Sequence, residues 1–352
     1  MNKFLRWILA VVTLATALAF IWIPLSRRIE TNRQMPEERA RLVICTSERD
    51  EVMNAVVPLF EEKYDIQVHL IKGEKTELLE RIHAEGNSPE ADLIMGLSLS
   101  DLYGEEDLFL EYVSVNDKYI LPQYRNISGF ATGYVLNGSC LVLNQTLARG
   151  LGITGYSDLL QPDLTGRIIM ANPSISFSGF QQLYNILLTG GGAEDKNAWL
   201  LARRVLEQAG KTGIVSSSDS VHTSVAKGEY LVGLASEDAC ANLMREGADI
   251  QIVYPREGSL FVPRTAAILK NAAHPEYARF FLDFLTGKDM QDIFGTLLTS
   301  RPVRRDAKTS QFLTDLKEIP VITEDESILQ QQREQILERY LKIWKEITED
   351  ER

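Results

Sequence analysis

Short apolar runs alternate with amphipathic helical segments along most of this 352-residue chain. The first series of predicted strands covers residues 41–45, 66–71 and 91–95, and a second series includes residues 167–171 and 230–234. Strands that alternate with helices form a mostly parallel sheet with helices on both faces. Because the chain is long for a single hydrophobic core, we predict an α/β protein with two lobes, each built on such a sheet.

Two extended runs, residues 133–144 and 259–269, separate the two series and are predicted to connect the lobes as crossing strands. Residues 325–349 form a long polar segment with an apolar stripe at helical spacing, which predicts an amphipathic helix. We expect this tail helix to pack on the first lobe. The predicted lobes are residues 41–133 with 265–352, and residues 134–264.

The amino terminus carries an uncharged apolar run, residues 7–25, between basic residues. Such a run is long enough to cross a membrane. The small residues at positions 17 and 19 favour cleavage, whereas the apolar residues 20–25 favour retention. We therefore interpret residues 1–28 as a signal peptide or a membrane anchor and residues 29–40 as a linker. The rest of the chain is expected outside the cytoplasm, either periplasmic or anchored to the outer face of the membrane.

The chain has a formal net charge of −12, which argues against nucleic acid as a partner. Its four histidines leave little acid–base machinery, and the GxSxG and HExxH motifs are absent from the sequence. We therefore expect a monomeric binding protein without catalytic activity, cofactor or metal centre. The three cysteines, Cys45, Cys140 and Cys240, lie in apolar surroundings and are expected to be small buried hydrophobic residues.

Hydroxyl side chains cluster where predicted strands end and helices begin. Ligands of parallel sheets bind at this edge, and helix N-termini with hydroxyl donors suit the oxygens of a phosphate group. The alternative is that these serines only cap helices. The candidate residues are Thr46, Ser47, Gly96 and Ser98 in the first lobe and Ser174, Ser176, Ser178, Ser216, Ser217 and Ser218 in the second.

The order of several segments resembles the type II periplasmic binding proteins, in particular the extracellular solute-binding family that includes ferric-iron binders and hexose-phosphate or phosphonate binders. The segments are LVICTS, EADLIMGLSLSDL, GYVLNGSCLVLN, YSDLLQPDLTGRIIMANPSISFSG, GEYLVGLASEDA and RPVRRDA. The resemblance implies two lobes joined by crossing strands, a small polar solute in the cleft, and delivery of that solute to the permease of an ABC importer.

The resemblance also bears on the solute. Ferric-iron binders of the family carry adjacent tyrosines after the strand that matches YLVGL, but residues 235–240 here contain none. We therefore expect a sugar phosphate, another organophosphate or a phosphonate, and serine loops similar to these occur in the family's hexose-phosphate binders. In this interpretation Glu237 or Asp238 accepts hydrogen bonds from the solute, His222 donates or accepts, and Arg301 pairs with an anion.

Two alternatives stay open at this point. Glu237, Asp238 and His222 are also potential ligands of ferric iron, in an iron-transport protein. The amino-terminal run and the polar tail helix are also compatible with a membrane-tethered domain that senses a solute for a signalling partner. Arg301 has an alternative role as well, as one half of an ion pair between the lobes.

Overall fold

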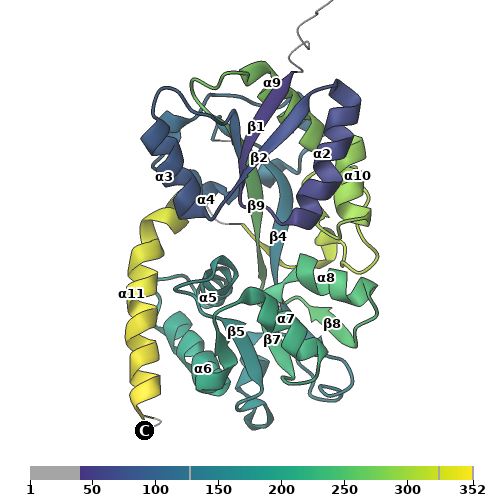
Figure 1. Ribbon diagram of the computed structural model, residues 1–352. Coiled ribbons are helices and arrows are strands. Elements are labelled where there is room, and N and C mark those ends of the chain that lie inside the picture. Colours follow the sequence, from purple (N-terminus) through teal and green to yellow (C-terminus); the bar gives the residue numbers. More distant parts are fainter. Residues whose placement is uncertain (1–39, 127, 324–325, 351–352) are drawn as a thin grey trace, which may run out of the picture.

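The first lobe is built on three parallel strands with β1 in the centre, and the computed structural model describes residues 40–126, 128–323 and 326–350. The strands are β1 (Arg41–Thr46), β2 (Gln67–Lys72) and β3 (Leu93–Ser98). Helices α2 (Asp50–Tyr64), α3 (Lys75–Glu85), α9 (Pro275–Leu285) and α10 (Lys288–Thr296) cover this sheet (Figure 1). Because helices pack on both faces of the sheet, all residues of β1 except the first are buried. A strand with one face in water would instead alternate buried and exposed side chains.

Two long antiparallel strands, β4 (Ala131–Asn144) and β9 (Ser259–Ile268), pass from one lobe to the other. The first half of β4 pairs with β9, and from Ser139 onward β4 pairs with β7 and then β8 of the second lobe. This change of partner makes one continuous sheet of both lobes. The predicted crossing strands are thus present where the sequence indicated them.

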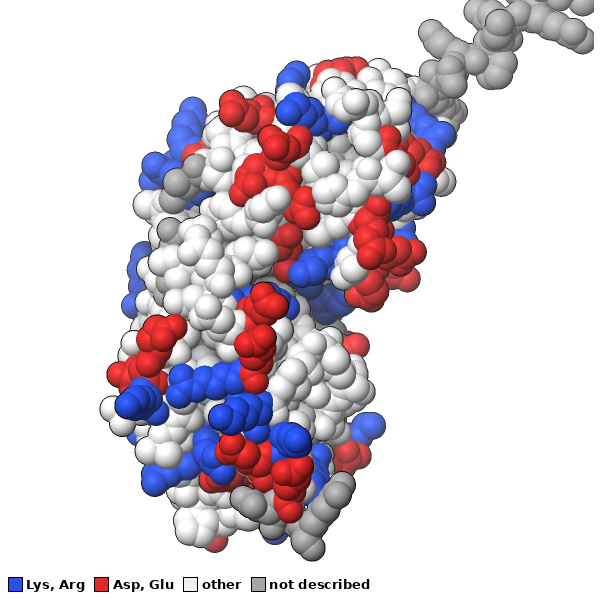
Figure 2. Space-filling view, turned by 90° about the vertical axis from the view of Figure 1, so that its left-hand side faces the viewer, with Lys and Arg blue, Asp and Glu red and all other residues white. Residues whose placement is uncertain are grey.

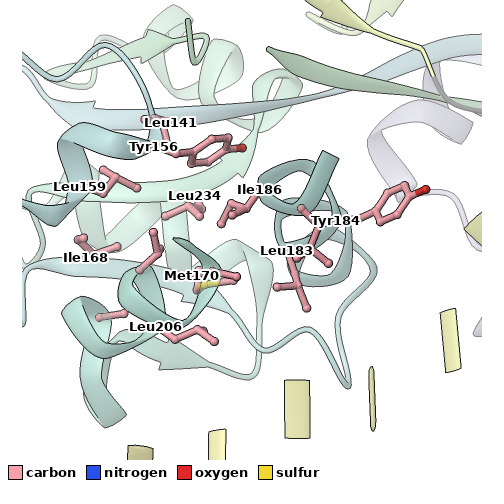
Figure 3. Packing of buried hydrophobic residues seen from close by; sticks show 14 of the residues in the cluster. Leu141, Tyr156, Leu159, Ile168, Met170, Leu183, Tyr184, Ile186, Leu206 and Leu234 are labelled. Atoms are coloured by element: carbon pink, nitrogen blue, oxygen red, sulfur yellow. The ribbon is translucent and has the colours of Figure 1, made fainter. Parts of the chain in front are cut away.

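The second lobe repeats the alternating pattern, which confirms the predicted two-lobed α/β fold. Its strands are β5 (Ile168–Ala171), β6 (Ile214–Val215), β7 (Val232–Ser236) and β8 (Ile250–Val253), and its helices are α5 (Phe177–Thr189), α6 (Lys196–Gly213), α7 (Ser218–Ala226) and α8 (Glu237–Arg245). Leu183 and Ile186 of α5 and Leu206 of α6 pack on Met170 and Leu234 of the sheet (Figure 3).

The remaining elements are short. They are α4 (Leu99–Leu102), β10 (Arg301–Pro302), β11 (Val321–Ile322) and 3-10 helices at Glu106–Leu108, Asp117–Tyr119, Pro122–Tyr124, Tyr156–Leu160, Pro162–Leu164 and Leu316–Glu318. The three cysteines are buried within the two lobes, as expected from their apolar surroundings.

The tail helix α11 (Glu326–Asp350) corrects one prediction, because its apolar stripe packs on the second lobe and not on the first. Leu329, Ile336, Tyr340 and Ile347 join the hydrophobic core that α5 and α6 form there. Only its amino-terminal end reaches the first lobe, where it contacts α4. The sequence revealed the stripe, but an apolar stripe does not specify which of two lobes will cover it.

Two further findings concern the surface and the membrane. On the face that carries α11, acidic and basic side chains are interspersed over the lower lobe (Figure 2), unlike the basic stripe typical of nucleic-acid binding. Within the described ranges, no helix is long and apolar enough to span a bilayer. The predicted signal or anchor, residues 1–28, and all of the linker except residue 40 lie outside those ranges.

Candidate ligand-binding cleft

Two cavities of about 390 and 170 Å³ lie between the lobes, beside the crossing strands. They share four lining residues, Asn137, Ser176, Phe177 and Arg264, and therefore form one continuous cleft. Asn137 belongs to β4 and Arg264 to β9, whereas Ser176 and Phe177 begin α5. Both crossing strands and the second lobe thus meet at the point where the cavities join.

The amino-terminal ends of several helices line this cleft. The first lobe contributes the start of α3, at Lys75 and Thr76, and the second lobe contributes the starts of α5, α7 and α8. A helix N-terminus carries a partial positive charge and free N–H groups. Helix ends that converge from both lobes place several N–H donors in this cleft, which is the kind of environment that suits an anion.

Arg264 is the cation at the centre of the cleft. Its Nη1 atom donates a hydrogen bond of 2.6 Å to Oε1 of Glu48, while 31% of the side chain remains exposed. The hydroxyl of Tyr134 donates to the same carboxylate oxygen. Glu48 raises the pKa of Arg264, so the guanidinium is fixed in place and charged, with part of its surface open to a solute.

Most of the predicted serines line the cleft, but their hydroxyls also have partners. Ser176 caps α5 by accepting from the N–H of Gly179, and Ser174 donates to Oδ1 of Asn172. Ser47 donates to the carbonyl of Gly96, and Ser98 donates to Asp101. A hydroxyl that donates in this way keeps lone pairs, and one that accepts keeps its proton, so capping and solute binding are compatible.

The other predicted serines and threonine divide between the cleft and the surrounding structure. Ser178 contacts Ser236 at 3.2 Å between their Oγ atoms, and Ser218 lies beside them in the smaller cavity. Ser216 and Ser217 are exposed outside both cavities, and Ser217 caps α7. Thr46 is buried and accepts from the N–H of Glu48, so it supports the loop rather than lining the cleft.

Glu237 and Arg301 form a buried ion pair instead of lining the cavities. The Nε and Nη2 atoms of Arg301 donate to the two carboxylate oxygens of Glu237 at 2.8 and 2.9 Å. Tyr254 donates a further hydrogen bond to Glu237. The charge and hydrogen-bonding groups of each side chain are paired with those of the other, so we exclude both residues from the candidate site. The position of Arg301 matches the alternative role considered for it, one half of an ion pair.

Asp238 and His222 do line the smaller cavity. Asp238 accepts a hydrogen bond of 2.9 Å from Nη2 of Arg49, which lies in the first lobe, so this ion pair joins the two lobes across the cleft. Burial lowers the pKa of His222, which leaves the imidazole neutral at pH 7 with one donor and one acceptor nitrogen.

Sequence analysis missed Arg264, Asn137, Arg49 and Arg333 as lining residues. A signal was present for Arg264, because it is a charged residue inside the apolar crossing strand SLFVPRTAAI. The tail-helix residue Arg333 gave no such signal, since arginine is ordinary on a polar helix.

A glycine is required at position 96, where β3 lies close to the loop that follows β1. Its φ of +101° is unfavourable for other residues, and a Cβ atom there would lie 2.9 Å from the backbone nitrogen of Glu48. Gly96→Ala is therefore expected to destabilise the fold by more than about 1 kcal/mol in urea denaturation. Gly104→Ala is the matched control, because Gly104 has a φ of +90° but no atom near its Cβ position. Equal losses in the two variants would contradict the role of this close approach.

The tyrosines that the resemblance associates with ferric-iron binding do not line this cleft in the described part of the chain. Among the residues that the structure describes, no tyrosine lines either cavity and no group of three or more His, Cys, Asp or Glu side chains is placed to hold a metal ion. Tyr134 comes near the cleft, but its hydroxyl is bonded to Glu48, and burial, followed by the charge of Glu48, raises its pKa well above the usual value.

Two lobes joined by crossing strands, with a polar cleft between them, are the architecture of the solute-binding proteins that serve ABC importers. The sequence model for bacterial extracellular solute-binding proteins matches residues 55–321. This chain therefore belongs to that family, whose members bind small solutes outside the cytoplasm and deliver them to a membrane permease.

Individual relatives agree on the fold and differ in what they bind. Iron uptake protein A1 of Synechocystis sp. is 26% identical over 271 residues, which cover 73% of this chain and 74% of the relative. The binding protein AfuA of Actinobacillus pleuropneumoniae, solved with fructose 6-phosphate, has a TM-score of 0.73 and 24% identity, covering 87% of this chain and 99% of AfuA.

A second similar solved structure is that of a two-component system protein that mediates signal transduction. It has a TM-score of 0.69 and 26% identity, and the match covers 81% of this chain and 95% of that one. The same architecture thus occurs in transport and in signalling.

Proposed function

We propose that the protein captures a small phosphorylated or phosphonate metabolite in the interlobe cleft and delivers it to an ABC permease without chemical turnover. The observation that carries this proposal is the position of Arg264, a charged guanidinium among helix N-termini from both lobes. A planar guanidinium donates two parallel hydrogen bonds to a phosphoryl group. Helix N-termini add N–H donors at the same place.

The size and lining of the cleft favour an organic phosphate over the inorganic ion. The larger cavity, at about 390 Å³, exceeds what one phosphate ion fills, and serine hydroxyls, Asn137 and Asp101 surround it. These groups suit the hydroxyls of a sugar. Asp238 and neutral His222 continue the polar lining into the smaller cavity.

A thermal-shift screen tests this proposal directly. We expect a hexose 6-phosphate or an aminoalkylphosphonate to stabilise the purified protein, because a ligand at 100 times its Kd adds about 2.7 kcal/mol to the free energy of unfolding. Ferric citrate, inorganic phosphate and spermidine serve as comparison solutes. Stabilisation by ferric citrate alone would contradict the proposal and favour iron transport. Unchanged solute after prolonged incubation would support binding without turnover.

A second function, solute sensing for a signalling partner, is favoured by the similarity to the two-component protein. It requires that the predicted anchor, residues 1–28, be retained. Mass spectrometry of the mature amino terminus distinguishes the two cases: a chain that begins at residue 20 has no anchor, whereas an intact amino terminus favours the tethered form.

A further inference from the structure

The tail helix α11 spans the two lobes beside the cleft. It contacts α4 of the first lobe and packs along α6 of the second lobe, where Arg203 and Glu346 form an ion pair of 2.7 Å. Tyr340 is fully buried and donates a hydrogen bond of 3.1 Å to Asn172. Asn172 in turn accepts from the hydroxyl of Ser174, which lines the cleft. Hydrogen bonds to Asn172 thus connect the tail helix to the serine loop.

One side chain of α11, that of Arg333, lines the larger cavity itself. Its guanidinium lies over the ring of Phe180, 4.3 Å from the centroid. Its Nη1 atom is buried and has no hydrogen-bond partner in the described part of the chain. A buried donor without an acceptor is costly, and such a group in a native cavity indicates an acceptor that the protein alone does not supply.

Protein carboxylates near Arg333 do not meet this need. Asp101 is the acidic residue whose charge acts on Arg333. Its carboxylate already accepts hydrogen bonds from Nζ of Lys75 at 2.9 Å and from the hydroxyl of Ser98 at 2.7 Å. Burial is the dominant influence on Arg333 and lowers its pKa, as expected for a cation that has lost water without gaining a partner.

We propose that the guanidinium of Arg333, which lines the larger cavity, binds an anionic oxygen of the solute, so that the tail helix forms part of the solute-binding site. Arg264 and Arg333 line the same cavity, one from a crossing strand and the other from α11. The solute is thereby held by two guanidinium groups, which selects for a doubly charged phosphate or phosphonate over a singly charged carboxylate. This inference rests on the proposed function and identifies a residue that determines specificity for it.

Binding titrations of the full-length chain with fructose 6-phosphate test the inference. Arg333→Gln should raise the Kd roughly tenfold or more, because it removes one charged hydrogen bond. The salt dependence of binding should also weaken, while the midpoint of thermal unfolding without solute should change little, since the variant loses the stacking on Phe180 but no protein hydrogen bond of Nη1. Arg339→Gln is the matched control: Arg339 stacks on Trp199 from the same helix but does not line the cleft.

Equal affinity of Arg333→Gln and the wild type, or an equal loss in Arg339→Gln, would overturn the role of Arg333 and leave the proposed function standing. If the wild type binds no phosphate ester or phosphonate, the proposed function itself fails. If ferric citrate stabilises the wild type instead, the variants are compared with that solute, and unchanged affinity of Arg333→Gln would overturn the inference as well. If only spermidine stabilises the wild type, the inference also fails, because a polyamine has no anionic oxygen for Arg333 to bind.

Discussion

Replacing Arg264 with glutamine is expected to weaken binding of a phosphorylated solute by about 1.5 to 3 kcal/mol, which is roughly 10- to 100-fold in Kd. The reason is that Arg264 presents a fixed charge where both cavities and both lobes meet. Isothermal titration with fructose 6-phosphate measures the loss. A lysine at this position keeps the charge but not the two parallel donors, so Arg264→Lys should fall between glutamine and the wild type.

The pairing of Arg264 with Glu48 needs a control, because glutamine at 264 leaves a buried carboxylate without a cationic partner, bonded to the hydroxyl of Tyr134 and the backbone N–H of Arg49. The double variant Glu48→Gln/Arg264→Gln replaces both charges and keeps the shapes of the pair. It should fold with near wild-type stability and still bind poorly. Wild-type affinity in this variant would show that Arg264 serves only to neutralise Glu48. Glu48→Gln alone frees the guanidinium and should preserve or tighten binding.

Replacing Arg301 with methionine is expected to lower the free energy of unfolding by about 3 to 5 kcal/mol. The side chains of Arg301 and Glu237 are only 3% and 0% exposed, so this variant leaves an uncompensated buried carboxylate. The pair also joins α8 of the second lobe to β10, which lies against the part of β4 that pairs with β9. Urea denaturation followed by circular dichroism measures the loss.

A double variant separates the ion pair from the packing around it. Glu237→Leu/Arg301→Met removes both charges, and replacement of a buried pair by apolar side chains is often neutral or stabilising. We therefore expect it to recover most of the stability that Arg301→Met loses. Wild-type stability of Arg301→Met, or a double variant no more stable than Arg301→Met, would contradict the role of the ion pair. Solute affinity should change little in the double variant, since neither residue lines the cavities.

Amino-acid order alone determined the local structure and the class of the protein. Apolar runs such as residues 41–45 are buried strands because helices cover both faces of a parallel sheet, and this pattern appears as a continuous run in the sequence. The antiparallel crossing strands β4 and β9 were visible as long apolar runs, because most of their side chains are buried. Hydroxyls at the ends of strands also indicated the cleft, because helix starts concentrate N–H donors.

Only the tertiary structure decided which side chains meet. Glu237 is one residue from Asp238 in sequence, but it turns inward to Arg301 while Asp238 faces the cleft and Arg49. Glu237 and Arg301 are 64 positions apart in the sequence, and Arg49 and Asp238 are 189 positions apart. No local sequence pattern extends over such separations. The docking of α11 was also decided only by the tertiary structure. Burial of its apolar stripe against either lobe would lower the free energy of the protein to a similar degree, because the hydrophobic effect is not directional. Arg333 lines the cleft because Leu329, Ile336 and Tyr340 of the same helix pack in the core of the second lobe.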